Sequence, residues 1–238
     1  METITCLFAF VTFLAVISLT VAATDDEKRR IDCYPEAPYS FGAPIDGSCR
    51  QRNCIFQSAG SPGAPWCFFP QESYGYTMFN VSTLSNGYKV YLTRLTKYTS
   101  PFPDPIDNLI LDVLYLNSKV LHLKIYDAKN KRYEVPIEFN DITDSNTNKD
   151  NSDFSFTFEN RNTDSVFIFK VIRKSTGTIL FDTSLGGFVF CDQFIQIATY
   201  LPTASNLYGL GENNHASLTH DMNYRTWGKY LNVTIYLL

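Results

Sequence analysis

The sequence predicts a mainly β protein in which a small disulfide-stapled module precedes an antiparallel β-sandwich. Two observations lead to this prediction. Four of the six cysteines lie within residues 33–67, where proline and glycine recur too often for a long helix or strand. After residue 76, short segments alternate between apolar and polar side chains and are separated by turn-forming residues, which is typical of a sandwich.

Residues 1–23 are predicted to be a secretory signal peptide. The run from Ile4 to Ala23 is apolar apart from Thr, Ser and a cysteine, and the small side chains of Val21 and Ala23 suit cleavage before Thr24. The alternative is an uncleaved anchor, because the run approaches the roughly 20 residues that span a bilayer. Both interpretations place the rest of the chain in an oxidising compartment of the secretory pathway, and cleavage would leave no membrane span.

The cysteine-rich module contains too little apolar surface to fold without cross-links. Its cysteines are Cys33, Cys49, Cys54 and Cys67. A zinc site is the weaker interpretation, because the sequence offers no Cys-x-x-Cys knuckle and no nearby histidine. We therefore predict no metal and no cofactor.

One cysteine of the predicted mature chain remains after these four. Cys191 follows a short apolar run, and Cys6 belongs to the predicted signal. We expect Cys191 to be a buried, inert thiol. The alternative is a reactive or intermolecular thiol.

The remaining chain shows repeated strand signals and no helical periodicity. The segment 143–153 is rich in Ser, Thr, Asn and Asp, and it predicts a solvated loop. His122 lies on the polar face of its segment and is expected at the surface. The predicted strands are 87–93, 109–115, 120–126, 133–138, 154–158, 167–172, 179–182 and 194–200.

The composition argues against a nucleic-acid partner, and the length allows one ordinary domain in addition to the module. The chain has 238 residues, 45% of them hydrophobic, and a formal net charge of -4. Acidic and basic residues are interspersed, so no basic patch indicates nucleic-acid binding. Two glycosylation sequons begin at Asn80 and Asn232, and Asn80 is expected in a polar connection after the module.

Three stretches of the module are distinctive, and they are Arg30-Ile31-Asp32-Cys33, Cys49-Arg50-Gln51-Arg52-Asn53-Cys54 and Pro65-Trp66-Cys67-Phe68-Phe69-Pro70. With these stretches the module resembles a trefoil (P-type) domain over residues 30–70. The resemblance implies that Cys33 pairs with Cys54 and Cys49 with Cys67. Two cysteines of the family pattern are missing, since Ile55 stands at one position and no cysteine shortly precedes Cys33.

Four further motifs follow the module, and they are Asp127–Pro136, Asp192–Gln196 with Leu201-Pro202, Leu207–Glu212 and His220–Trp227. Their order resembles the start of the family 31 glycoside hydrolases of the lysosomal and intestinal α-glucosidase type. The resemblance implies a galactose-mutarotase-like β-sandwich over residues 76–230, a secreted or lysosomal location, and an α-glucan or oligosaccharide partner. Members are retaining enzymes that release terminal α-1,4-linked glucose.

The resemblance also implies that this chain is inactive alone. The family's two catalytic carboxylates lie in a (β/α)₈ barrel of about 250 residues. Eleven residues follow Trp227, and the nucleophile motif Trp-x-Asp-Met-Asn-Glu does not occur in the sequence. The position matching a sugar-contacting aspartate of the family is Asp221, which we expect to bind substrate hydroxyls when a barrel is present.

Three other interpretations fit parts of the sequence. Glu212 and Asp221 could form a glycosidase carboxylate pair, or Glu212, His215 and His220 a metal site, but no spacing argument supports either. A stand-alone secreted protein that binds carbohydrate or mucin-type glycans is the main rival. Residues 231–238 depart from the family pattern and are expected to form an exposed edge without a partner.

Overall fold

The structure is a computed structural model, and it confirms a mainly β protein with antiparallel sheets. The described residues are 25–34, 46–70, 74–97, 100, 102–134, 142–144, 146–159, 165–200, 207–208, 217–220 and 234–237. The predicted signal peptide lies outside them, so the structure does not test it.

The cysteine-rich module contains two short helices and one small hairpin. They are α1 (Asp25–Lys28), α2 (Asp46–Gln51), β1 (Ile55–Phe56) and β2 (Cys67–Phe68). Helix α2 ends where Asn53 takes a positive φ of 60°, a conformation that asparagine tolerates, and its N–H donates to the carbonyl of Arg50. This turn brings Cys54 back toward the rest of the module, where the four cysteines are buried in one cluster.

One face of the sandwich is a five-stranded antiparallel sheet in the order β12-β6-β5-β4-β3. In β4 and β5 buried apolar residues alternate with half-buried ones, as the sequence pattern predicts. The strands are β3 (Tyr76–Leu84), β4 (Gly87–Arg94), β5 (Asn108–Asn117), β6 (Val120–Asp127) and β12 (Thr234–Leu237).

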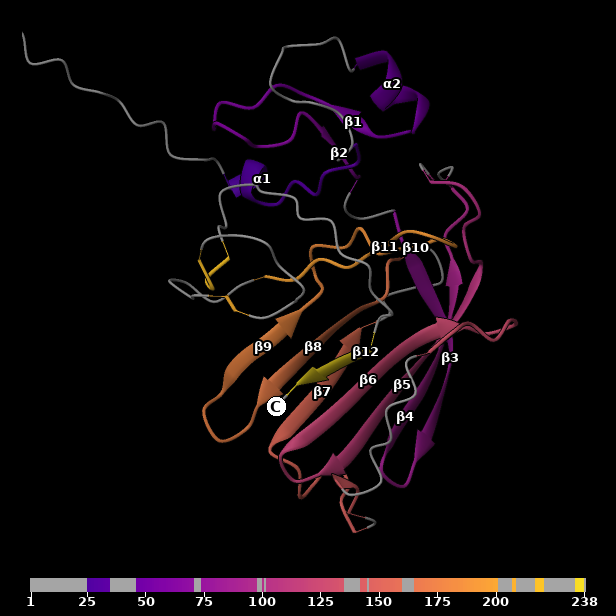
Figure 1. Ribbon diagram of the computed structural model, residues 1–238, viewed down its shortest axis with the longest axis vertical. Coiled ribbons are helices and arrows are strands. Elements are labelled where there is room, and N and C mark those ends of the chain that lie inside the picture. The colour runs from indigo at the N-terminus through magenta and orange to yellow at the C-terminus, as the bar shows by residue number, and fades with distance from the viewer. Residues whose placement is uncertain are drawn as a thin grey trace, which may run out of the picture.

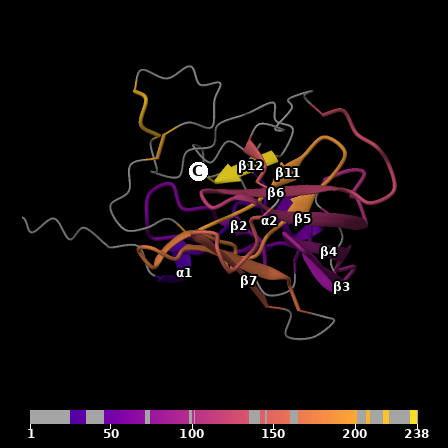
Figure 2. The same ribbon diagram turned by 90° about the horizontal axis from the view of Figure 1, so that it is seen from below.

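The second sheet has three antiparallel strands in the order β7-β8-β9, and Figure 2 shows β7 lying below β5 and β6. The strands are β7 (Phe154–Glu159), β8 (Ile168–Arg173) and β9 (Thr178–Asp182). The core between the sheets is mostly aliphatic on the side of β4 to β6, where Tyr115 is also buried, and mostly aromatic on the side of β7 and β8. The rings of Phe156 and Phe169 are 5.2 Å apart. The inward-facing side chains of the two sheets therefore pack against one another and form the core of the sandwich.

A two-stranded ribbon, β10 (Val189–Phe190) with β11 (Ile195–Gln196), links the sandwich to the cysteine-rich module. In Figure 1 this ribbon lies between the module and the main sheets. Val189 and Cys191 pack with the module's cysteines and Phe69 in one buried cluster. The module and the sandwich therefore share a continuous apolar contact.

Three predictions about elements were wrong or incomplete. The strand predicted over 194–200 is confined to Ile195–Gln196, because the chain leaves the ribbon after two residues. Residues 133–134 are not in a strand, and 135–140 lie outside the described residues. The tail was expected to lack a partner, but β12 pairs with β6 from Thr234 opposite Lys124 to Leu237 opposite Leu121.

Candidate functional site

Two disulfides lie at the centre of the module. They join Cys33 to Cys54 and Cys49 to Cys67, the pairs that the trefoil resemblance implies. The sulfurs of Cys33, Cys54 and Cys67 lie within 4.8 Å of one another because the bridges are adjacent. Metal ions bind thiolates, whereas these sulfurs are bonded to sulfur. The cluster is therefore a cross-link and not a candidate metal centre.

Buried charged side chains hold the hairpin of the module in place. The Arg30 guanidinium donates to the carbonyls of Gln57, Ser58 and Pro65 at 3.0–3.4 Å and lies over the Phe68 ring at 4.4 Å. The carboxylate of Glu27 accepts hydrogen bonds from Gly60 N–H and Ser61 Oγ at 2.7 and 2.6 Å. Because these contacts satisfy loop backbone groups, they fix the hairpin without regular structure.

This framework presents one aromatic side chain to solvent. Trp66 is 42% exposed and contacts Phe56 edge-on, with ring centroids 6.2 Å apart. Gln57 N–H donates to the Trp66 carbonyl at 2.8 Å, which fixes the backbone at that point. An exposed indole on a rigid hairpin can stack on an apolar face of a ligand.

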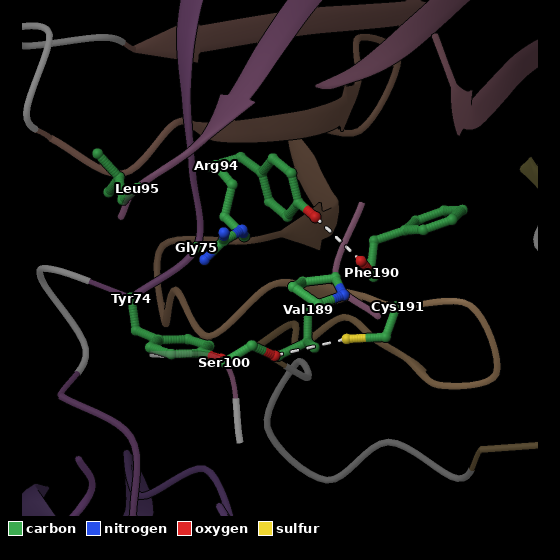
Figure 3. Close-up of a pocket in the computed structure, with 10 residues that line it drawn as sticks. Tyr74, Gly75, Arg94, Leu95, Ser100, Val189, Phe190 and Cys191 are labelled. Atoms are coloured by element: carbon green, nitrogen blue, oxygen red, sulfur yellow. Dashed lines mark hydrogen bonds between the residues drawn. The ribbon is translucent and has the colours of Figure 1, made fainter. Parts of the chain in front are cut away.

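A small cavity lies where the module meets the sandwich, and Figure 3 shows the side chains around it. Its volume is about 10 Å³, which is close to the minimum for a single water. Tyr76 Oη donates to the Ile106 carbonyl at 2.6 Å and lies 3.1 Å from the Phe190 carbonyl. The cavity is too small for a sugar, and the Tyr76 hydroxyl beside it bonds to the protein's own backbone.

Cys191 lines this cavity and is a free, buried cysteine. Its Sγ lies 3.6 Å from Ser100 Oγ. Burial is the main cause that raises the pKa of the thiol, and burial also raises the pKa of Tyr74 to about 12. The sulfur is therefore kept in the unreactive thiol form, as the sequence analysis expects for a buried cysteine.

The loop predicted to contact substrate lies mostly outside the described residues. Asp221 and Asn232 are both outside them, as are Glu212 and His215 of the weaker interpretations. His220, the residue before Asp221, is buried, and its N–H donates to the Leu207 carbonyl at 2.8 Å. Two of the family-like segments are thereby joined immediately before Asp221.

Two other family-like segments also meet in space. Arg132 Nη1 lies 3.3 Å from the Asp192 carboxylate, and its other terminal nitrogen donates to the Asp192 carbonyl. Arg132 also lies 5.6 Å from the centroid of the Phe190 ring. Upstream, Asp127 closes the turn before Arg132 by accepting from Lys129 N–H and from Asn130. Although burial favours the protonated form, these hydrogen bonds outweigh it and lower the pKa of Asp127.

The first sequon lies at a place that the sequence analysis did not predict. Asn80 was expected in a polar connection, but it lies within β3, and its side chain is exposed. The strand was missed because Asn, Ser and Thr interrupt its apolar pattern. The pairing with β4 provides the long-range contacts that stabilise it.

Sequence reasoning also missed Arg52, which joins the module to the sandwich. Its guanidinium lies 3.9 Å from the Tyr34 ring centroid and 5.6 Å from that of Phe102, and it donates to the Cys33 carbonyl at 3.0 Å. Phe102 stacks in turn on Phe194, with centroids 3.7 Å apart. No local signal marks Arg52, because its ring partners lie far away in the sequence.

Comparison with known proteins identifies the module and relates most of the chain to longer enzymes. Residues 24–70 match the trefoil (P-type) domain. The chain is 36% identical over 199 residues to intestinal sucrase-isomaltase of Oryctolagus cuniculus, covering 84% of this chain and 10% of the relative. It is 34% identical over 207 residues to the Homo sapiens sucrase-isomaltase, covering 85% and 10%.

A lysosomal relative gives a similar result. Lysosomal alpha-glucosidase of Mus musculus is 35% identical over 192 residues, which are 77% of this chain and 18% of the relative. The chain thus spans about a tenth to a fifth of the length of these relatives. Within the described part of the chain, no helix is long and apolar enough to cross a membrane.

Proposed function

Because this chain carries a trefoil domain and is homologous over most of its length to the α-glucosidases of glycoside hydrolase family 31, we propose that it is a non-catalytic, substrate-positioning part of such an enzyme. The observation that carries the proposal is the extent of the match, which includes both the cysteine module and the sandwich. The intestinal and lysosomal names of the relatives fit the secretory pathway, where disulfides form.

The proposed role follows from what a retaining glycosidase requires. Such an enzyme needs two carboxyl groups about 5 Å apart on either side of the glycosidic bond. The nucleophile motif of the family is missing from this sequence. We therefore assign bond cleavage to another part of the enzyme and propose substrate binding as the role of this chain.

Asp221 is the residue proposed to contact substrate. A carboxylate accepts two sugar hydroxyls at once, and such charge-assisted hydrogen bonds are stronger than neutral ones. The contact between His220 N–H and the Leu207 carbonyl supports this assignment, because it fixes the chain one residue before Asp221. The proposed ligand is an α-linked glucan or oligosaccharide whose remaining contacts come from a catalytic barrel.

Three measurements test the proposal. An antibody against the cysteine module should detect, in secreted or lysosomal fractions, a protein several times heavier than this chain. In that longer protein Asp221→Asn should raise KM for maltose more than tenfold and leave the melting temperature unchanged. The purified chain alone should not hydrolyse maltose, and turnover by it would overturn the non-catalytic assignment.

The exposure of Trp66 favours a second candidate, a stand-alone carbohydrate-binding protein. An immunoblot band at the chain's own mass would support it. The purified chain should then bind malto-oligosaccharides or mucin-type glycans on an array, and Trp66→Ala should abolish that binding. An array without binding would exclude this candidate.

A further inference from the structure

The free edge of the five-stranded sheet carries exposed apolar side chains. β3 is the last strand of that sheet, and from Phe79 onward β4 is its partner strand among the described residues. At the start of β3, the Tyr76 carbonyl accepts a hydrogen bond from Phe167 N–H. Phe79 is 59% exposed and Val81 is 37% exposed. A free edge with exposed apolar residues is a template for pairing with another chain, so native proteins generally protect such edges.

A β-bulge interrupts the register of β3 at Phe79, the residue before the sequon asparagine. Met78 lies opposite Leu92 and Asn80 opposite Tyr91, so Phe79 is an extra residue without a partner in the strand register. Tyr91 lies between the buried Val90 and Leu92 and therefore faces outward.

The bulge also changes the direction in which Phe79 points. In a regular strand Phe79 and Asn80 would face opposite sides of the sheet, but a bulge sets two residues against one. The ring centroids of Phe79 and Tyr91 are 6.0 Å apart. Phe79, Asn80 and Tyr91 consequently lie together on the outer face.

The Asn80 side chain is oriented and accessible. Its Oδ1 accepts a hydrogen bond from Val81 N–H at 2.9 Å, and the residue is exposed. Glycosylation uses the amide nitrogen, so this hydrogen bond can persist in the glycoprotein. The rest of the sequon, Val81 and Ser82, lies in the same strand.

We propose that an N-linked glycan on Asn80 covers Phe79 and Tyr91 and shields the β3 edge from self-association. The apolar face of the first sugar packs on the two rings, and the hydrated remainder of the glycan keeps a second chain away from the edge formed by Phe79 to Ser82. Residue spacing alone does not predict this role, because the bulge brings the three side chains together.

The modification uses the ordinary donor of the secretory pathway. A polyprenyl-diphosphate-linked oligosaccharide transfers its reducing-end sugar to Asn80 Nδ2. The C1–O bond to the diphosphate breaks, a C1–N bond forms, and the amide loses one proton. The lipid diphosphate leaves with the bonding electrons, so no oxidant or reductant is needed.

The test uses the full chain secreted from a glycosylating eukaryotic cell. Peptide mass spectrometry after enzymatic glycan release in ¹⁸O-water should show labelled aspartate at position 80. Light scattering after gel filtration should show a monomer for the native glycoprotein. Asn80→Gln and Ser82→Ala should each remove this glycan and at least double the apparent molar mass at the same concentration.

Three further samples separate edge protection from a general folding defect. Release of the glycan from the folded native protein should cause the same association without any substitution. Phe79→Thr added to Asn80→Gln should restore the monomer, while Asn232→Gln should leave the monomer unchanged. An unmodified Asn80, a monomeric deglycosylated protein, or a double variant that still associates would each overturn the proposal. None of these readouts depends on glucoside hydrolysis.

Discussion

Gly187 approaches Ile31 so closely that a Cβ at position 187 would lie 2.7 Å from Ile31 Cδ1. Gly187 precedes the ribbon of β10 and β11, and Ile31 belongs to the trefoil domain, so this contact is one point where the two parts meet. Gly187 also has a φ of +69°, which disfavours any residue with a side chain.

Gly187→Ala should lower the free energy of unfolding by about 1.5–2.5 kcal/mol, since the end of the Ile31 side chain must move in addition to the backbone strain. Gly177→Ala is a matched control, because Gly177 has a φ of +70° but no atom lies within 4 Å of the point that its Cβ would occupy. That variant should lose only about 1 kcal/mol. Urea unfolding measures the loss of unfolding free energy in both variants. Equal losses would mean that the contact with Ile31 contributes nothing.

Arg52→Lys should also destabilise the junction, by about 1 kcal/mol. A lysine cannot stack its head group between Tyr34 and Phe102 while donating to the Cys33 carbonyl. Arg50→Lys is the control, because Arg50 forms an exposed pair with Asp46 on α2 and should change stability by less than about 0.5 kcal/mol. Thermal unfolding distinguishes the two, and no difference between them would contradict a role for the stack.

Asp182 should make stability depend on pH in the acid range. Burial favours its protonated form, but hydrogen bonding to Ser184 and the pair with Lys170 Nζ at 3.1 Å outweigh it, so the folded-state pKa is lowered. The unfolded chain therefore binds more protons at acid pH, and this contribution, present above the unfolded pKa of about 4, is lost as pH falls toward the folded value.

We expect Asp182→Asn to cost about 1–2 kcal/mol at pH 7 and much less at pH 3. Urea unfolding at both values measures the difference. Glu134→Gln removes the exposed partner of Lys124 and should show little loss at either pH. A loss from Asp182→Asn that is the same at both pH values would show that the carboxylate's ionisation is not involved.

The thiol of Cys191 should be inaccessible in the folded secreted protein. Ellman's reagent should modify no cysteine under native conditions and one in guanidinium chloride, because Cys191 is buried and its pKa is raised by burial. Cys191→Ala should abolish the signal in denaturant. Rapid reaction of the native protein, or a reducible dimer on a gel, would instead support an intermolecular thiol.

The sequence by itself determined the fold class and most strands. The alternation in β4, β5, β6 and β7 is a local property, because side chains two residues apart share a face of any strand. The motif order likewise pointed to trefoil and α-glucosidase relatives, and the comparisons show both. The role of Asp221 and the use of both sequons remain predictions.

Only the tertiary structure decided which segments meet. The pairing of β12 with β6, the bulge that puts both Phe79 and Asn80 on the face of Tyr91, and the contacts of Arg52 and Gly187 all depend on residues that are distant in the sequence. The same apolar stretch can lie at an exposed edge or pair with a neighbour. The choice depends on long-range pairing and packing, because the hydrogen-bond partner of a strand lies elsewhere in the chain.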